Sequence, residues 1–310
     1  MEVPLAGVRG SAASAARPHG RRHLVHGIGL SAGGDLPPVD PLALRVADVC
    51  SRAVRALALM AASMHSDWMT APFMAYDIHA RPQVYARLAG ALYLAVIVLG
   101  GWAEGYVSNA LIVAGDDQAT LRSILAHAAL WKMGLAANLL VPLIAVVQLW
   151  IEYLLLRPAG RGLALLFVLL NIASLSVEAV SKVFQLMVLP LASGATGATA
   201  EHGFALASMA LLGHGIAFNG ALIFFGAACL VSGSLIYRST YLPRTLGVLM
   251  VLAGASYLIA AFAELLAPGF AAMITPGILL PVLVGETALC LWLLIKGVDR
   301  ARWDATVSRT

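Results

Sequence analysis

Ionisable side chains are rare inside the long apolar stretches of this sequence, and Glu286 lies near the middle of the last one. It follows Pro281 by five residues, and a helix kinked at that proline would leave backbone carbonyls without partners. An ionised carboxylate at membrane depth is poorly solvated, so it must be paired, hydrated or protonated. His214, within the fourth stretch, is the best-placed titratable neighbour, although a lone histidine in an apolar helix usually serves packing. Both residues are candidates for binding a ligand or an ion.

Glu178 and Lys182 lie four residues apart in the third stretch, which places them on one face of a helix. A structural ion pair, in which each charge neutralises the other, is favoured over a functional role. If this pair also faces Glu286 and His214, the four residues could line one polar cavity that opens outward.

Three further polar residues complete the predicted pathway. Asn219 follows His214, while Glu104 and Glu264 lie near the outer ends of their stretches, where they could simply reach interfacial water. Glu152 lies near the opposite end of its stretch, beside Arg157, and is predicted to be interfacial as well. The predicted ligand or ion pathway consists of Glu286, His214, Glu178, Lys182, Asn219, Glu104 and Glu264.

The motifs of several well-known enzyme classes do not occur in the sequence. It has no HExxH zinc motif, no GxSxG elbow and no GxxxxGK[ST] phosphate loop. The three cysteines, Cys50, Cys229 and Cys290, have no metal-ligand spacing and support no disulfide framework. We therefore predict neither a metal site nor a cofactor. Gly101 and Gly105 match a small-xxx-small helix contact, which is weak evidence in a chain with 29 glycines.

The composition is that of an integral membrane protein. Hydrophobic residues make up 60% of the chain and charged residues 12%, and the mean hydropathy is +0.86. An apolar helix needs about 20 residues to cross roughly 30 Å of hydrocarbon. The sequence predicts an all-α polytopic bundle of six spans: Ala86–Ser108, Leu130–Leu156, Gly162–Leu191, Leu206–Tyr237, Leu246–Leu266 and Thr275–Gly297.

Basic residues gather in alternate loops, and such loops face the cytoplasm. We therefore predict a multi-pass protein of the cytoplasmic (inner) membrane, with both termini cytoplasmic and the lipid bilayer as its partner. The net charge of +4 comes from residues at helix ends and predicts no nucleic-acid binding. The residues that determine this topology are Arg87, Arg157, Arg161, Arg238, Arg244 and Lys296.

Two pairs of spans resemble each other. The segment 88–94 (LAGALYL) recurs as 252–258 (LAGASYL), and Pro142 and Pro281 precede similar apolar runs that end in a basic residue. Each proline predicts a local kink inside its helix. The pattern is compatible with three related helical hairpins, but chance similarity between apolar helices is an equal competitor.

The first 80 residues differ from the rest and form a low-complexity extension that is predicted to be disordered. An amphipathic helix is possible between Leu42 and Met64. The favoured interpretation is that translation begins downstream, at Met60, Met64, Met69 or Met74. The predicted organisation is this extension, a membrane domain at 81–298 and a cytoplasmic tail at 299–310.

Several motifs of the membrane domain resemble one known family. They are RLAG at 87–90, LRP at 156–158, RGLA at 161–164, GALIFFG at 220–226, LIYRS at 235–239, LPRTLG at 242–247, GE at 285–286 and LWLLIKG at 291–297. In order and spacing they resemble the bacterial membrane-protein family called domain of unknown function 4386, over about residues 81–298. The resemblance implies six membrane helices and no assigned reaction, ligand or catalytic residue. The N-terminal extension departs from the family, whose members usually begin just before the first helix.

Three functions stay open on the sequence. Buried acids and a kinked helix favour a transporter or binding protein for a small molecule or an ion. A structural or regulatory membrane partner, whose buried charges only hold the bundle together, is the nearest alternative, and a membrane-embedded enzyme is less favoured. The identity of the ligand and the oligomeric state cannot be derived from these residues.

Overall fold

The computed structural model describes residues 78–195, 197 and 199–308, which belong to one compact unit of the chain, Pro41–Thr310. Every regular element in this part is a helix, which confirms the predicted all-α membrane bundle. Apart from residues 78–80, the predicted N-terminal extension lies outside the described residues.

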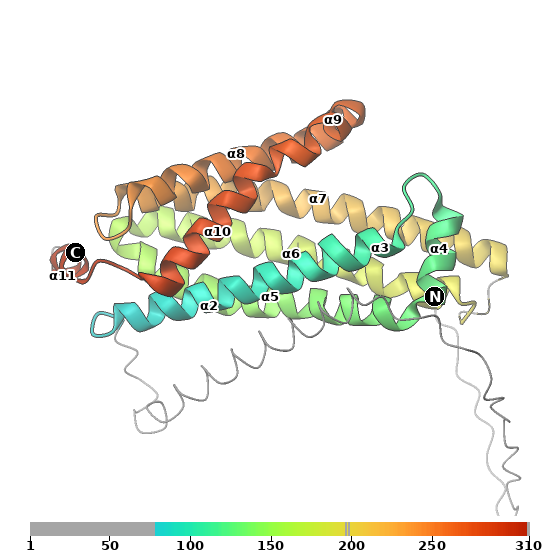
Figure 1. Cartoon of the computed structure of the whole chain (residues 1–310), viewed down its shortest axis with the longest axis horizontal. Helices are drawn as coiled ribbons and strands as arrows, with labels where there is room; N and C mark the ends of the chain where they lie inside the picture. The colour runs from blue at the N-terminus through green and yellow to red at the C-terminus, as the bar shows by residue number, and fades with distance from the viewer. Residues whose placement is uncertain (1–77, 196, 198, 309–310) are drawn as a thin grey trace, which may run out of the picture. The chain divides into compact units, whose positions relative to one another are not determined.

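Among the described residues, five helices are long and apolar enough to cross a membrane, and a sixth span is formed if two shorter helices that meet at 52° are counted together. The elements are shown in Figure 1. Their bounds are α2 Pro82–Gly100, η1 Gly101–Ser108, α3 Asn109–Leu111, α4 Asp117–Ala126, α5 Ala128–Leu156, η2 Arg157–Ala159, α6 Arg161–Ala192, α7 Ala200–Arg238, α8 Arg244–Leu266, α9 Pro268–Ile278, α10 Leu280–Ile295 and α11 Arg300–Val307.

The sixth span differs most from its prediction. It begins at Pro268, not at Thr275, and it is divided at Leu279 into α9 and α10. Pro281 lies in the first turn of α10, where a missing N–H leaves no helical hydrogen bond unmade. The predicted kink inside a helix is therefore a break between two helices. Pro142, in contrast, lies within an unbroken α5.

The six spans close into a ring. Each of α2, α5, α6, α7, α8 and α10 packs against the next one in the chain, and α10 returns to pack against α2 (Figure 1). The chain therefore encloses an interior that all six spans face. We call the two ends of this ring the α11 end, where α2 begins, and the α4 end.

Four glycines bring α7 and α8 into backbone contact. Gly226 and Gly233 on α7 face Gly254 and Gly247 on α8, in antiparallel order. A Cβ atom on Gly247 would lie 2.6 Å from the carbonyl oxygen of Gly233, and one on Gly254 would lie 2.6 Å from that of Gly226. Small residues at such positions allow close packing in lipid, where dispersion contacts drive helix association.

The part of the first span that follows α2 is a π-helix, η1, and not the regular helix that was predicted. Such segments insert an extra residue into a helical turn and frequently occur at functional sites. Gly101 and Gly105 lie in it, and a Cβ atom on either would meet nothing within 4 Å. The predicted small-xxx-small contact at these two glycines is therefore not made within the described chain.

The predicted tail contains a packed helix. Trp303 of α11 is fully buried and stacks edge-on against Tyr241, with 4.9 Å between the ring centroids. The Tyr241 hydroxyl donates a hydrogen bond of 2.7 Å to the carbonyl of Leu155. Because burial raises the pKa of Tyr241, this hydroxyl stays protonated and continues to donate. Helix α11 thus holds the ends of α5 and α7 together.

Candidate functional site

Lys182 on α6 is almost completely buried, with 1% of its side chain exposed. Its Nζ lies 2.6 Å from Oε1 of Glu104, on η1, and 3.9 Å from Oε1 of Glu178. The predicted pair with Glu178 is therefore the longer of two contacts. The closer partner, Glu104, comes from a different helix. Its position in the sequence had suggested contact with interfacial water, but it pairs with the buried Lys182, and 27% of its side chain is exposed.

The side chains of Asn138, Gln185 and His214 surround this ion pair. Asn138 donates to Oε1 of Glu104 at 2.8 Å and to Gln185 at 3.1 Å. The Nε2 atom of His214 lies 3.8 Å from Oε1 of Glu104, and its Nδ1 lies 3.1 Å from the Ser181 carbonyl. Together these residues tie η1, α5, α6 and α7 together. We call them the Lys182 cluster: Glu104, Asn138, Glu178, Lys182, Gln185 and His214.

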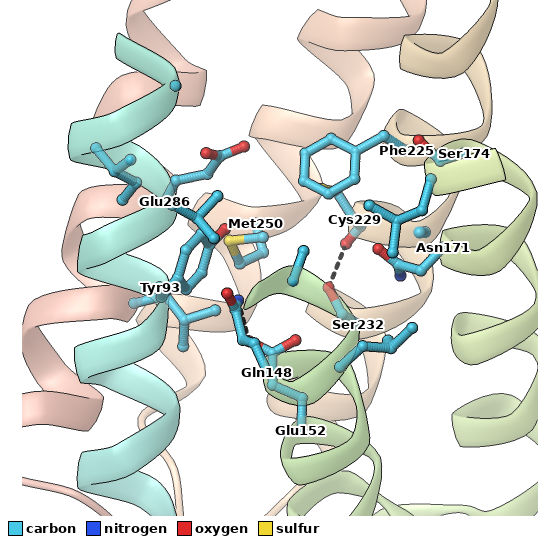
Figure 2. A pocket seen from close by; sticks show the side chains of 18 of the residues that line it. Tyr93, Gln148, Glu152, Asn171, Ser174, Phe225, Cys229, Ser232, Met250 and Glu286 are labelled. Atoms are coloured by element: carbon cyan, nitrogen blue, oxygen red, sulfur yellow. Dashed lines mark hydrogen bonds between the residues drawn. The ribbon is translucent and has the colours of Figure 1, made fainter. Parts of the chain in front are cut away.

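The ring of helices encloses a cavity of about 340 Å³. Its wall is mostly apolar but carries four carboxylates, Glu104, Glu152, Glu178 and Glu286. Among the described residues, no lysine, arginine or histidine lines it. Figure 2 shows Glu286 and Tyr93 on one side of this space, with Phe225, Cys229 and Ser232 across from them. Glu104 and Glu178 pair with Lys182, which does not line the cavity, whereas Glu152 and Glu286 have no cation partner among the described residues.

Glu286 lies on the cavity wall but does not meet His214. Its Oε1 accepts a hydrogen bond of 2.8 Å from the Tyr257 hydroxyl, on α8. No ion pair joins Glu286 to any cation in the described part of the chain, and Lys182 is engaged by Glu104. The predicted meeting of Glu286 with His214 and Lys182 is therefore wrong, while Glu286 and Glu178 do share one cavity.

Glu152 is a cavity residue that the sequence had suggested to be interfacial. Its Oε1 accepts a hydrogen bond of 3.0 Å from Nε2 of Gln148, one turn earlier on α5. No ion pair from the described residues reaches it, and Arg157 instead contacts His79 at 3.5 Å. Figure 2 shows the Gln148 amide and the Glu152 carboxylate projecting into the cavity from α5.

The oxygen of Gln148 is unusual among the polar atoms of this wall. The side chain is 8% exposed, and its Oε1 is buried without a hydrogen-bond partner. Asn171, Ser174 and Ser232, which also line the cavity, each donate to a backbone carbonyl. Buried polar groups are nearly always paired, so an unpaired acceptor on a cavity wall marks a place for a donor.

Four of the predicted pathway residues do not line the cavity: His214 and Lys182, which belong to the Lys182 cluster, and Asn219 and Glu264. Glu264 is exposed near the end of α8, and Asn219 donates to the carbonyl of Ala261 at 3.1 Å, which joins α7 to α8. Gln148 and Glu152, which were not among the predicted pathway residues, do line the cavity. A signal was present in the sequence, because the polar residues of α6 recur at spacings of three or four and Gln148 and Glu152 of α5 are four apart, which places each set on one helix face. The residues of this set on α6 are Asn171, Ser174, Glu178, Lys182 and Gln185.

The predicted topology determinants gather at one end. They are Arg87, Arg157, Arg161, Arg238, Arg244 and Lys296, near the helix termini at the α11 end or in the first turns there. Here α2, α6 and α8 begin, and α5, α7 and α10 end.

The family model described as Domain of unknown function (DUF4386) matches residues 88–297. The chain belongs to this family. The matched range includes every residue that lines the cavity, from Tyr93 to Leu293. No curated protein and no solved structure matches the chain. The description of the family assigns no function. The apolar helices of the chain indicate a multi-pass membrane protein.

Proposed function

We propose that this protein binds a small molecule or an ion in its central cavity and transports it across the membrane. The observation that carries the proposal is the cavity of about 340 Å³, on whose wall two carboxylates, Glu152 and Glu286, pair with no cation among the described residues. Small-molecule sites typically have volumes of about 300–1,000 Å³ and a mostly apolar wall with a few polar groups. Ionisable residues inside a membrane are costly, which makes them candidates for substrate or ion pathways.

The division of the sixth span supports transport over binding alone. Glu286 lies on α10, which meets α9 at 52°. In many transporters the substrate site is formed near interrupted helices, since a break allows one part of a span to move against the other. A rotation of α9 or α10 about Leu279 would alter the wall that carries Glu286.

The proposed setting is the bacterial cytoplasmic membrane, with the α11 end and both termini in the cytoplasm. Support comes from the basic residues gathered at that end. Reporter fusions after Asp117, Arg161, Glu201, Arg244 and Pro268 should alternate between the two sides. Two neighbouring fusions on the same side would contradict this topology.

The Lys182 cluster favours the second function, a structural or regulatory partner, for one part of the molecule. There each charge meets an opposite charge from another helix or turn. That explanation does not extend to Glu152 and Glu286, whose half-buried carboxylates pair with no cation among the described residues. A bundle that needed only to be stable would have apolar residues at these two positions.

The test is retention of a ligand by protein purified in mild detergent, measured by mass spectrometry of the released small molecules and lipids. Ala145→Trp places a large side chain on the cavity wall and should abolish retention. Ala136→Trp is the matched control, because Ala136 is exposed on the same helix. Equal retention by both variants, or no retained molecule in the wild-type protein, would contradict the proposal.

A further inference from the structure

We infer that the ligand of the cavity is a protonated primary or secondary amine with an apolar body, held by Glu152 and Gln148. The ammonium group would donate N–H bonds to the Glu152 carboxylate and to Oε1 of Gln148. This inference rests on the proposed function and specifies the chemical class of its ligand. It is carried by the hydrogen bonding of these two side chains and by the surface around them.

The orientation of the Gln148 amide is set by its neighbour. Its Nε2 donates to Oε1 of Glu152 at 3.0 Å, so the amide oxygen faces away from that bond. This oxygen is buried and has no partner. An acceptor left unpaired costs about 1–3 kcal/mol, and only a hydrogen-bond donor relieves that cost. The missing group is therefore a donor.

The charge of the site indicates a cation. The Glu152 carboxylate receives a neutral donor from Gln148, and no described lysine, arginine or histidine pairs with it. Glu152 is half-buried, and removing a carboxylate from water without a counterion is costly. A primary or secondary ammonium supplies the positive charge together with at least two N–H donors, one for each oxygen. A quaternary ammonium supplies the charge but no donor.

The rest of the wall fits an organic body better than a bare metal ion. The surface near Gln148 is largely apolar and aromatic. Within the described residues, no three His, Cys, Asp or Glu side chains gather as metal ligands would. Aromatic faces attract organic cations as well as apolar groups. The side chains available to the body are Tyr93, Leu149, Phe167, Phe225, Cys229 and Met250.

Glu286 is a weaker candidate for binding the ammonium group. Its carboxylate already accepts a hydrogen bond from the Tyr257 hydroxyl. Among the described residues, the one buried side-chain acceptor without a partner is Oε1 of Gln148, which hydrogen-bonds through its amide to Glu152 and not to Glu286. The Gln148–Glu152 pair is the place where an acceptor and an unpaired negative charge coincide.

The experiment measures binding of three probes with one apolar body to the purified full chain by calorimetry at pH 7. The probes are 4-phenylbutylamine, its trimethylammonium analogue and 4-phenylbutan-1-ol. The amine should bind saturably, the trimethylammonium analogue at least tenfold more weakly, and the alcohol more weakly still. Glu152→Gln and Gln148→Leu should each weaken amine binding at least tenfold. Glu264→Gln, which makes the same chemical change outside the cavity, should leave it unchanged.

Several results would overturn the inference. An affinity for the alcohol equal to that for the amine would indicate a neutral ligand. An affinity for the trimethylammonium compound equal to that for the amine would show that the site does not require an N–H donor. Saturable displacement of the amine by Na⁺ or K⁺, lost in Glu152→Gln, would indicate an inorganic cation. If the amine fails to bind while the wild-type protein retains another molecule that Ala145→Trp loses, the amine class is wrong and the proposed function stands. If no molecule is retained either, both are wrong.

Discussion

Two polar regions of the same bundle differ in how their carboxylates are paired. In the Lys182 cluster, the cation lies 2.6 Å from Glu104 and 3.9 Å from Glu178, and Asn138 adds a further donor. At the other region, Glu152 and Glu286 each receive one neutral donor, and the oxygen of Gln148 receives none. The first region is complete within the chain, whereas the second lacks a cation and a donor.

The difference separates two purposes for buried polar groups. Removing one partner of a buried ion pair leaves the other charge uncompensated and is strongly destabilising. An unpaired carboxylate, in contrast, already lowers stability, so replacing it by a neutral group of the same shape should not destabilise the fold. Comparing substitutions in the two regions therefore tests which charges hold the bundle and which serve a ligand.

The largest effect is expected for Lys182→Met, which removes the cation between Glu104 and Glu178. Loss of a buried partner costs about 3–5 kcal/mol, so the thermal unfolding midpoint in detergent should fall substantially. Adding Glu104→Gln should restore part of the loss, because it neutralises the nearer carboxylate. An unfolding midpoint equal to that of the wild-type protein would show that the cluster does not hold the bundle.

A substitution in the glycine contact of α7 and α8 shows how much stability is lost when packing alone is disturbed and no charge is changed. Gly254→Ala places a Cβ atom 2.6 Å from the carbonyl oxygen of Gly226, and overpacking of this kind costs about 1–3 kcal/mol. Gly215→Ala on α7 is the control, because its Cβ would meet nothing within 4 Å. Equal unfolding midpoints for the two variants would mean that α7 and α8 are not in backbone contact.

A smaller effect is expected for Tyr241→Phe, which removes the hydrogen bond to Leu155 and should lower stability by about 1 kcal/mol. Because burial raises the pKa of Tyr241 above its ordinary value of about 10, its contribution is fully present below pH 10 and is lost as the pH rises further. Unfolding curves at pH 8 and pH 11 should thus converge for wild type and variant. A difference that grows with pH would contradict this assignment.

The sequence predicts the spans better than it predicts their partners. Apolar runs and the positions of Arg157, Arg161 and Arg244 locate the helix ends at the α11 end to within a few residues, because hydrophobic length is a local property, while α7 and α9 begin earlier than predicted at the other end. The partner of Lys182 is not local. Glu178 is four residues away and was the obvious choice, yet Glu104, from another helix, comes closer.

Two local features also escaped prediction. The apolar length of the first span does not distinguish the π-helix at Gly101–Ser108 from an α-helix. The break at Leu279 was expected nearer Pro281, although a proline fits the first turn of a new helix as well as it kinks an existing one. Gln148 and Glu152 were readable as one helix face, but nothing in the sequence shows that the Gln148 oxygen lacks a partner.

The most direct measurement of the central claim is the unfolding midpoint of the ligand-free double variant Glu152→Gln/Glu286→Gln. Both substitutions keep the side-chain shape and leave the hydrogen bonds from Gln148 and Tyr257 possible. If these carboxylates serve a ligand, the midpoint should equal or exceed that of the ligand-free wild-type protein. A fall as large as that of Lys182→Met would show that the two regions do not differ and that the cavity carboxylates, like the Lys182 cluster, hold the bundle together.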